Sequence, residues 1–247
     1  MKKELFFTSD EHYGSDRTLE LSKRPFKSTE EMDAYMIEKF NEIVPDNAVT
    51  YHLGDFGDFS VLQKLNGMHV LIFGNYELKD MIEETNTEKM IRDIYAETDH
   101  AIINPENRPD KSLDDIAVLV LKLLESKESE CKYTELKERF YSYKRKFEKN
   151  GFITTEFIDM KYMHLDINPN CNDSVLKLFM THRPIDYLKT NDKNYFTLFG
   201  HIHGRQMVKK FGLDVGVDAH HFRPVSLKDV LFYKTAIEKH YDENVFI

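Results

Sequence analysis

Long apolar runs and abundant cysteine are both missing from this sequence of 247 residues. No stretch approaches the roughly 20 consecutive apolar residues that a helix needs to cross a bilayer. The residues before Leu5 are too few to include the hydrophobic region of a signal peptide. The two cysteines, Cys131 and Cys171, form no Cys-x-x-Cys motif and have no histidine at ligand spacing, which favours free thiols over a disulfide or a zinc site. These absences predict a cytoplasmic protein without a membrane partner.

An excess of positive charge is also missing, because 34 basic residues face 43 acidic ones and the formal net charge is −9. This balance disfavours a general surface for nucleic acid, although a nuclease stays an open alternative. A phosphate-bearing substrate would need local positive charge. The apolar share of 41% and the charged share of 31% are those of an ordinary globular protein, and we expect a single domain over residues 1–247.

Polar residues that suit metal ions follow two apolar runs in the first quarter of the chain. The run Leu5–Thr8 precedes Asp10 and His12, and the run 48–53 precedes the segment Gly54-Asp55-Phe56-Gly57-Asp58. Both runs are predicted strands, and in open α/β sheets ligands bind beyond the carboxyl ends of the strands. Asp10 and His12 alternate, so an extended backbone would point both to one side. A carboxylate beside an imidazole suits Mn²⁺, Fe²⁺ or Zn²⁺ better than Ca²⁺ or Mg²⁺.

The same arrangement recurs at three later places. The predicted strand 68–73 precedes Asn75, the strand 175–180 precedes His182, and the strand 195–199 precedes His201 and His203. Glycines on both sides of the last two histidines allow a tight turn with both rings facing one centre. Each motif alone has a bland explanation as turn chemistry, but five in a row favour a shared metal site.

Amphipathic patterns predict the helices. Ser28 and Glu31 form a capping box for one helix, and a second helix is expected from Asp80 to about Ala101, followed by a strand or its end at Ile102-Ile103. Two apolar stripes within residues 107–150 predict an inserted helical hairpin, which offers a surface for a protein partner or for self-association.

The remaining apolar runs predict further strands. Residues 152–167 are expected to form a strand or hairpin, and Leu213–Val217 and Val230–Tyr233 to form closing strands. Three arginines near the motifs, Arg17, Arg24 and Arg183, are candidates to bind substrate phosphate, with exposed side chains of no specific role as the alternative.

Taken in order, these motifs resemble the calcineurin-like metallophosphoesterases, in particular their small bacterial and phage branch. The pieces stand here as Asp10-Glu11-His12, Gly54-Asp55-Phe56-Gly57-Asp58, Gly74-Asn75-Tyr76-Glu77, His182 and Gly200-His201-Ile202-His203. The resemblance covers residues 1 to about 105 and 151 to about 235, outside the helical insertion. It implies a four-layer α-β-β-α sandwich of two mixed sheets flanked by helices.

The resemblance also implies two divalent metal ions, Mn²⁺ first, with Fe, Zn or Ni as alternatives. One ion would be held by Asp10, His12, Asp55 and His203, and the other by Asp55, Asn75, His182 and His201, so that Asp55 bridges them. A metal-bridging hydroxide would then attack a phosphodiester, nucleotide-like or otherwise, or a phosphomonoester.

One position departs from the family pattern. Tyr76 stands where the family has a histidine that protonates the leaving oxygen, and Asp58, which would support that histidine, would face a phenol instead. A phenol is a poorer proton donor than an imidazolium at neutral pH. We therefore keep a second hypothesis, a metal-binding interaction or scaffold protein with weak or lost catalysis.

Overall fold

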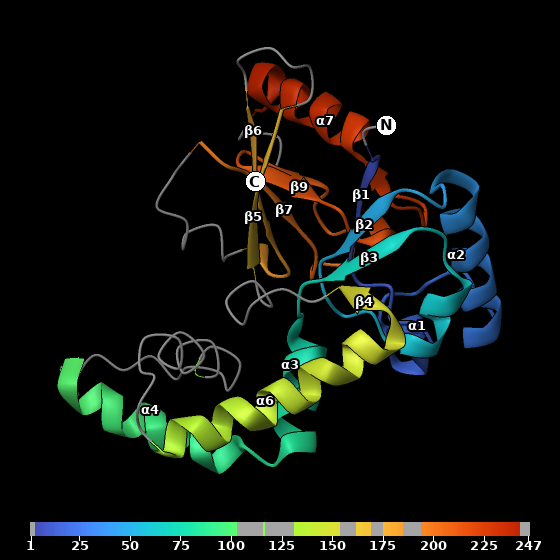
Figure 1. The fold of residues 1–247 in the computed structure, drawn as a ribbon. Coiled ribbons are helices and arrows are strands. Elements are labelled where there is room, and N and C mark those ends of the chain that lie inside the picture. Colours follow the sequence, from blue (N-terminus) through green and yellow to red (C-terminus); the bar gives the residue numbers. More distant parts are fainter. Residues whose placement is uncertain are drawn as a thin grey trace.

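The computed structural model describes residues 3–102, 116, 131–153, 162–168, 175–184 and 194–242. In this part of the chain an α/β fold is built on two mixed five-stranded sheets (Figure 1), and this confirms the two mixed sheets that the resemblance implied. The first sheet has the order β10-β1-β2-β3-β4. Strands β1 to β4 run parallel, and β10 pairs antiparallel with β1. The bounds are β1 Leu5–Thr8, β2 Val49–His52, β3 Met68–Leu71, β4 Phe152–Ile153 and β10 Val225–Ser226.

The second sheet has the order β5-β6-β7-β9-β8. Strands β6, β7 and β9 are parallel, whereas β5 and β8 pair antiparallel at the two edges. The bounds are β5 Tyr162–Ile167, β6 Leu176–Thr181, β7 Phe196–Phe199, β8 Val208–Lys209 and β9 Gly212–Asp214. Because β4 and β5 belong to different sheets, these two strands do not pair with each other as a hairpin, and residues 154–161 lie outside the described residues.

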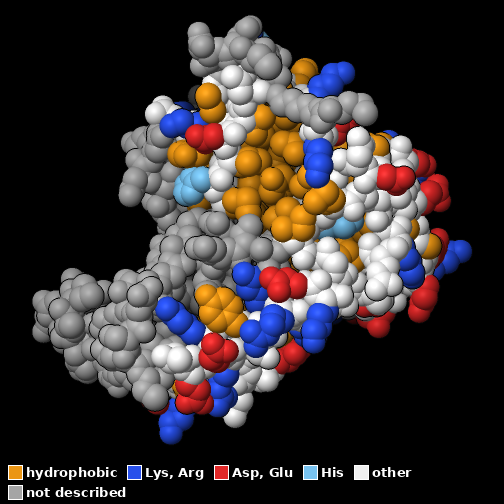
Figure 2. Space-filling view, in the orientation of Figure 1, with side chains coloured by type: hydrophobic (Ala, Val, Ile, Leu, Met, Phe, Trp, Pro, Cys, Tyr) orange, Lys and Arg blue, Asp and Glu red, His pale blue; other side chains and the backbone are white. Residues whose placement is uncertain are grey.

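Two hydrophobic clusters lie on opposite faces of the first sheet. Phe6 belongs to the cluster under the helices, and its neighbour Phe7 belongs to the cluster between the sheets, as the two-residue period of a strand requires. Hydrophobic side chains are also visible between the sheets at the centre of the face drawn in Figure 2. The helices are α1 Asp16–Leu21, α2 Thr29–Ile43, α3 Asn75–Thr85, α4 Glu88–Ile102, α6 Cys131–Asn150 and α7 Leu227–His240, with 3-10 helices at Phe59–Lys64 and Val217–Ala219.

The predicted strand Val230–Tyr233 is wrong, because these residues lie in α7. Ser226 caps this helix, and its hydroxyl accepts a hydrogen bond from the amide of Asp229 while the Asp229 carboxylate returns to Ser226. Val230 and Ile237 are buried seven residues apart, which is a helical spacing. The short β-branched and aromatic run concealed the capping box that begins the helix.

The predicted helix from Asp80 to Ala101 is two helices, α3 and α4. Asn86 adopts a left-handed backbone with φ of 50° and ends α3, a conformation that asparagine tolerates better than most residues. Ile102 is the last residue of α4 and not part of a strand, and Ile103 lies outside the described residues. Ser28 caps α2 as expected, but the Glu31 carboxylate accepts from the amide of Lys27 instead of closing the box on Ser28.

The second predicted helix of the insertion is present as α6. Of the first apolar stripe, only Ile116 is described, and it is helical and buried. Helix α6 buries Leu136, Phe140 and Phe147 in the cluster beneath the first sheet, so it is part of that hydrophobic core. Within the described ranges, none of the helices combines the length and the apolar character needed to traverse a bilayer.

Candidate metal centre

The seven predicted ligands all follow carboxyl ends of strands. Asp10 and His12 follow β1, Asp55 follows β2 and Asn75 follows β3. His182, His201 and His203 follow β6 and β7 of the second sheet. Because each sheet contributes parallel strands whose ends face the same edge, the two sheets together assemble one site.

Five of these residues have a left-handed backbone, which side chains other than glycine seldom adopt. The φ angles are 58° at Asp10, 51° at His12, 59° at Asp55, 72° at His201 and 47° at His203. The extended backbone expected for Asp10 and His12 is therefore wrong. Hydrogen bonds from the amide of Asp10 to the carbonyl of Gly54 (3.0 Å) and from that of His12 to the carbonyl of Asp55 (2.9 Å) hold the turn in place. Strained backbone of this kind concentrates at functional sites.

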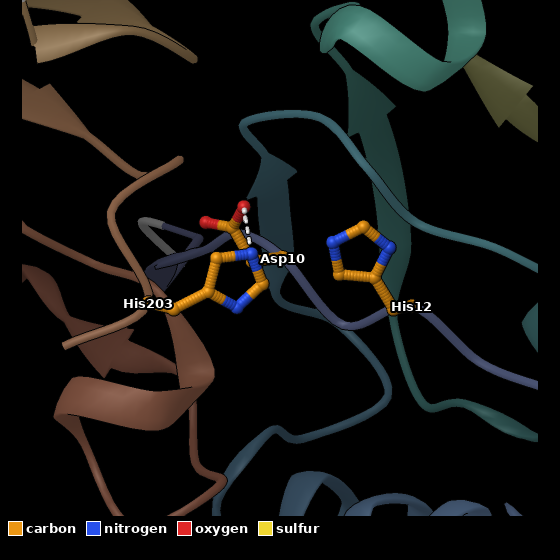
Figure 3. Close-up of side chains that lie close together, drawn as sticks. All are labelled: Asp10, His12 and His203. Atoms are coloured by element: carbon orange, nitrogen blue, oxygen red, sulfur yellow. Dashed lines mark ion pairs between the residues drawn. The ribbon is translucent and has the colours of Figure 1, made fainter. Parts of the chain in front are cut away.

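Asp10, His12 and His203 form a first triad whose ligand atoms all lie within 4.8 Å of one another. His203 Nε2 lies 3.8 Å from Asp10 Oδ1, the ion pair dashed in Figure 3. The rings of His12 and His203 stack with centroids 5.3 Å apart and an interplanar angle of 15°. Two distant stretches of the chain thus place an oxygen and two nitrogens around one point.

Asp10 also belongs to a second triad with Asp55 and His182. His182 Nε2 lies 3.4 Å from Asp55 Oδ2 and 4.0 Å from Asp10 Oδ1. Asn75 Oδ1 lies 3.0 Å from His182 Nε2 and 3.1 Å from His201 Nδ1, so the last two predicted ligands join this group. The two triads share Asp10, whereas the resemblance assigns the shared ligand to Asp55. The Asp55 Oδ2 atom is nevertheless also 3.6 Å from His12 Nε2, which places it beside both groups.

The donor atoms fit divalent metal ions. Asp10 Oδ1 and His12 Nε2 are buried and have no hydrogen-bond partner among the described residues, and such atoms are rare in proteins unless they bind a ligand or an ion. The mixture of carboxylate, amide oxygen and imidazole nitrogen suits Mn, Fe, Zn or Ni. The two overlapping triads could therefore bind metal ions.

Protonation of the histidines depends on their surroundings. Burial lowers the pKa of His12 to about 3 and that of His201 to about 4, so both rings are neutral near pH 7, the form that binds a metal. Burial also opposes protonation of His182, but the carboxylates of Asp55 and Asp10 outweigh it and raise the pKa of His182 to about 10. In the metal-free protein, this proton partly balances the charge of two buried acids.

Glu77, which was not among the predicted site residues, fixes the loop that presents Asp55. Its carboxylate accepts hydrogen bonds from the amides of Asp55 (2.9 Å), Phe56 (2.8 Å) and Gly74 (2.8 Å). Gly74 is required here, because a Cβ at this position would collide with the Asp55 carboxylate. The signal for Glu77 was its place as the acidic fourth residue of the Gly74 motif.

Glu11 and two histidines form a buried row under the first sheet. Glu11 Oε1 lies 2.6 Å from His52 Nδ1, and His52 Nε2 lies 3.0 Å from His69 Nδ1. All three side chains are buried. The row ties the Asp10–His12 turn to β2 and β3, and no pattern in the sequence pointed to it.

The predicted catalytic residues lie apart. The Tyr76 ring packs edge-on against His12 with centroids 5.0 Å apart, and its hydroxyl accepts a hydrogen bond from Arg17. The backbone amide of Tyr76 donates to Asp55 Oδ1 (3.0 Å). Asp58 is exposed and caps the 3-10 helix, with both carboxylate oxygens accepting hydrogen bonds from Ser60. No described hydrogen bond joins Asp58 to Tyr76.

The three predicted phosphate-binding arginines occupy different environments. Arg17 is exposed beside Tyr76, and Arg183 is half-buried next to His182 in the chain. The Arg24 side chain is fully buried and paired with Asp218, so it is not placed to meet a substrate. Asp218, which the sequence did not single out, lies 2.9 Å from His203 Nδ1.

Comparison with other proteins adds the fold but not a function. No family model matches this chain. The uncharacterized protein MJ1445 of Methanocaldococcus jannaschii is 30% identical over 83 residues, which is 30% of this chain and 47% of that protein, so the match spans about half of the relative's length. A crystal structure of the protein of unknown function AQ665 from Aquifex aeolicus aligns with a TM-score of 0.52 at 14% identity, over 94% of this chain and 100% of that one. This chain thus shares its overall fold with the Aquifex protein.

Proposed function

We propose that this protein is a dinuclear-metal phosphoesterase that hydrolyses a phosphodiester or phosphomonoester. The observation that supports it most is the pair of overlapping Asp/His triads, with buried ligand atoms that have no described hydrogen-bond partner. The ordered motifs that resemble metallophosphoesterases supply the reaction type. A pair of metal ions, when bound, would polarise the phosphate oxygens and activate water as the nucleophile.

The side chains around the triads have separate tasks in this proposal. Asp55 lies between His12 and His182 and would help to hold the ions. Arg17 is exposed beside the triads and offers a guanidinium to a phosphate oxygen. The Tyr76 hydroxyl is oriented by Arg17 and donates a hydrogen bond to the leaving oxygen of the ester.

The proposed substrate is a small phosphate ester or a nucleotide. The ions and Arg17 would supply the local positive charge that the net charge of −9 lacks. A long nucleic acid is disfavoured, because such binders spread basic residues over a wide surface. A screen of phosphomonoesters, diesters, cyclic nucleotides and single-stranded DNA with Mn²⁺ distinguishes these classes.

The test combines metal content with turnover. We expect about two equivalents of Mn²⁺ or a similar ion per chain by elemental analysis, together with Mn²⁺-dependent hydrolysis of bis-p-nitrophenyl phosphate. Asp55→Asn should abolish hydrolysis, whereas Asp46→Asn, at an exposed aspartate before the amino end of β2 and not at the carboxyl ends that carry the ligands, should leave it unchanged. One equivalent or none, or full activity in Asp55→Asn, would contradict the proposal.

One observation favours the second candidate, a metal-binding interaction protein without turnover. Tyr76 takes the place of the proton-donating histidine, and its hydroxyl is already hydrogen-bonded to Arg17. Under this alternative the protein binds two ions but hydrolyses no substrate of the screen. Its partner surface would lie on residues 107–150, and pull-down assays that depend on these residues would support it.

A further inference from the structure

Arg24 is a buried cation that binds the backbone of the metal-ligand turn. Its Nη2 donates to the carbonyl of Asp10 (2.6 Å) and its Nη1 to the carbonyl of Glu11 (2.7 Å). The two peptide groups that carry these carbonyls connect Asp10 to His12, both of which have a left-handed backbone. Arg24 therefore restrains the strained segment through its carbonyl groups, in addition to the hydrogen bonds made by its amides.

The same guanidinium binds Asp218 with two further hydrogen bonds. Arg24 Nε donates to Asp218 Oδ1 and Nη2 donates to Asp218 Oδ2, both at 2.9 Å. Asp218 Oδ2 in turn lies 2.9 Å from His203 Nδ1. A hydrogen on Nδ1 that is donated to this carboxylate leaves the lone pair of Nε2 facing Asp10, at 3.8 Å from Oδ1.

These contacts close a ring that joins both sheets. Starting at Asp10, the ring passes through Arg24, Asp218 and His203 and returns to Asp10. Arg24 precedes α2, Asp218 lies in a short 3-10 helix (Val217–Ala219) after β9, and His203 lies in the loop after β7. A planar guanidinium fork can satisfy two carbonyls and one carboxylate at once, which the point charge of a lysine cannot.

We propose that Arg24 and Asp218 are positioning residues that set the geometry of the metal site formed by Asp10, His12 and His203. This inference rests on the proposed function in so far as that site holds an ion. According to this inference, Arg24 positions the metal ligands and does not bind the substrate. Of the candidate ligands, Asp218 contacts His203, whereas Arg24 contacts the backbone of Asp10, which both triads share.

Asp218→Asn tests the role of the carboxylate. Asp218 Oδ2 faces both Arg24 Nη2 and His203 Nδ1, whereas Oδ1 accepts from Arg24 Nε. An amide has one oxygen and one nitrogen, so the variant loses either the bond to Arg24 Nε or the bonds to Arg24 Nη2 and His203 Nδ1. Loss of such a supporting contact lowers metal affinity about 10- to 100-fold. Titration calorimetry with Mn²⁺ should show this loss at one of two sites, while the other stays within about threefold of the unmutated protein.

Three further variants make the result specific. Asp46→Asn, the exposed control, should bind both ions normally. Ser22→Ala removes the other group near His203 Nδ1, a hydroxyl at 3.0 Å, and should also bind both ions normally. Arg24→Lys should weaken both sites, because it releases the carbonyls of Asp10 and Glu11. If Asp218→Asn does not fold, Asp218→Glu keeps the charge beside Arg24 and is expected to lose the same single site.

Several outcomes would overturn the inference. One is unchanged Mn²⁺ binding at both sites in a folded Asp218 variant. Another is an equal loss of Mn²⁺ affinity in Ser22→Ala and in Asp218→Asn. An unmutated protein that binds two ions but hydrolyses nothing would contradict the proposed function and leave this inference standing. An unmutated protein that binds no ion would contradict both.

Discussion

His182 has an unusual position among the site residues because it is buried between two carboxylates. Those carboxylates raise its pKa to about 10 against the opposing effect of burial, so the ring is charged in the metal-free protein at neutral pH. An ion that binds the His182 nitrogen must displace this proton. Metal binding and protonation are therefore in competition at this residue.

We expect Mn²⁺ affinity to rise by about tenfold per pH unit from pH 6.5 to 8.5, one proton being released per ion bound at His182. The direction follows from the raised pKa of His182. Below a pH of about 10 a proton occupies the His182 ring and competes with the metal ion, and this competition weakens as the pH increases. Calorimetry in buffers of different ionisation enthalpy measures the proton release. In His182→Gln the slope should shrink, and an equal slope in both proteins would contradict this assignment.

Tyr76 is the residue at which this chain departs from the motif it resembles. If its hydroxyl serves as a weak replacement for a proton donor, Tyr76→His should increase turnover of esters with poor leaving groups, by up to about 10²-fold. Hydrolysis of p-nitrophenyl esters should change little, because that leaving group needs no proton. The matched variant Tyr76→Phe should lower turnover of the poor leaving groups. Equal rates for all three proteins with every substrate would show that this position has no role in proton donation.

At the scale of single residues, the sequence identified the candidate ligands but not most of the side chains that hold them in place. All seven candidate ligands converge, since each follows a buried apolar run. Glu77 could have been predicted, because it is part of the Gly74 motif. Asp218 and the row from Glu11 to His69 could not, because the fold brings together residues that are far apart in the sequence. Arg24 was predicted to bind substrate phosphate because its neighbours in the sequence do not show that its side chain is buried and paired with Asp218.

At the scale of elements, helix α6 shows how an inserted segment becomes part of the core. Phe140 is fully buried, whereas the next residue, Tyr141, is 38% exposed. Two residues of similar size on one helix therefore differ in the surface they remove from water. This difference makes them a matched pair.

Phe140→Ala should lower the free energy of unfolding by about 3–5 kcal/mol, the usual cost of removing a buried aromatic ring. Tyr141→Ala should cost about 1 kcal/mol or less. Urea denaturation followed by circular dichroism measures both. Similar losses for the two variants would mean that α6 packs differently from the arrangement described.

Helices and strands were predicted correctly where a single apolar pattern dominated the segment. They were missed where a capping or turn residue contradicted that pattern. Strands β1, β2 and β3 are short apolar runs next to glycine-bearing turns, and the sequence located them. Helix α7 contains, after its first turn, an apolar run typical of a strand, and its Ser226–Asp229 box was the weaker signal in sequence. The break at Asn86 depends on one left-handed residue, which a helical stripe does not reveal.

For the whole molecule, ions at the site would connect the two sheets, because their ligands follow β1, β2 and β3 on one side and β6 and β7 on the other. Binding to the folded state alone stabilises it by about 2.7 kcal/mol per site at a ligand concentration of 100 times Kd. For a chain of this size, that corresponds to a rise in Tm of about 5–10 °C. Differential scanning calorimetry with Mn²⁺, reversed by EDTA, should show the rise, and Asp55→Asn should reduce it. An equal rise in Asp55→Asn would place the ions elsewhere.

The pairing of β10 with β1 bears on how the chain is made. Strand β1 cannot gain its neighbour β10, nor can Asp10 and Arg24 gain their partners His203 and Asp218, until residues more than 170 positions later have left the ribosome. At about 5–20 residues per second, Asp10 and His12 emerge on the order of 10 to 40 s before Asp218. Throughout this interval, the nascent chain carries carboxylates and imidazoles that have no assembled site. We therefore expect that the site can bind metal ions only after the residues up to β10 have been synthesised and β10 has paired with β1.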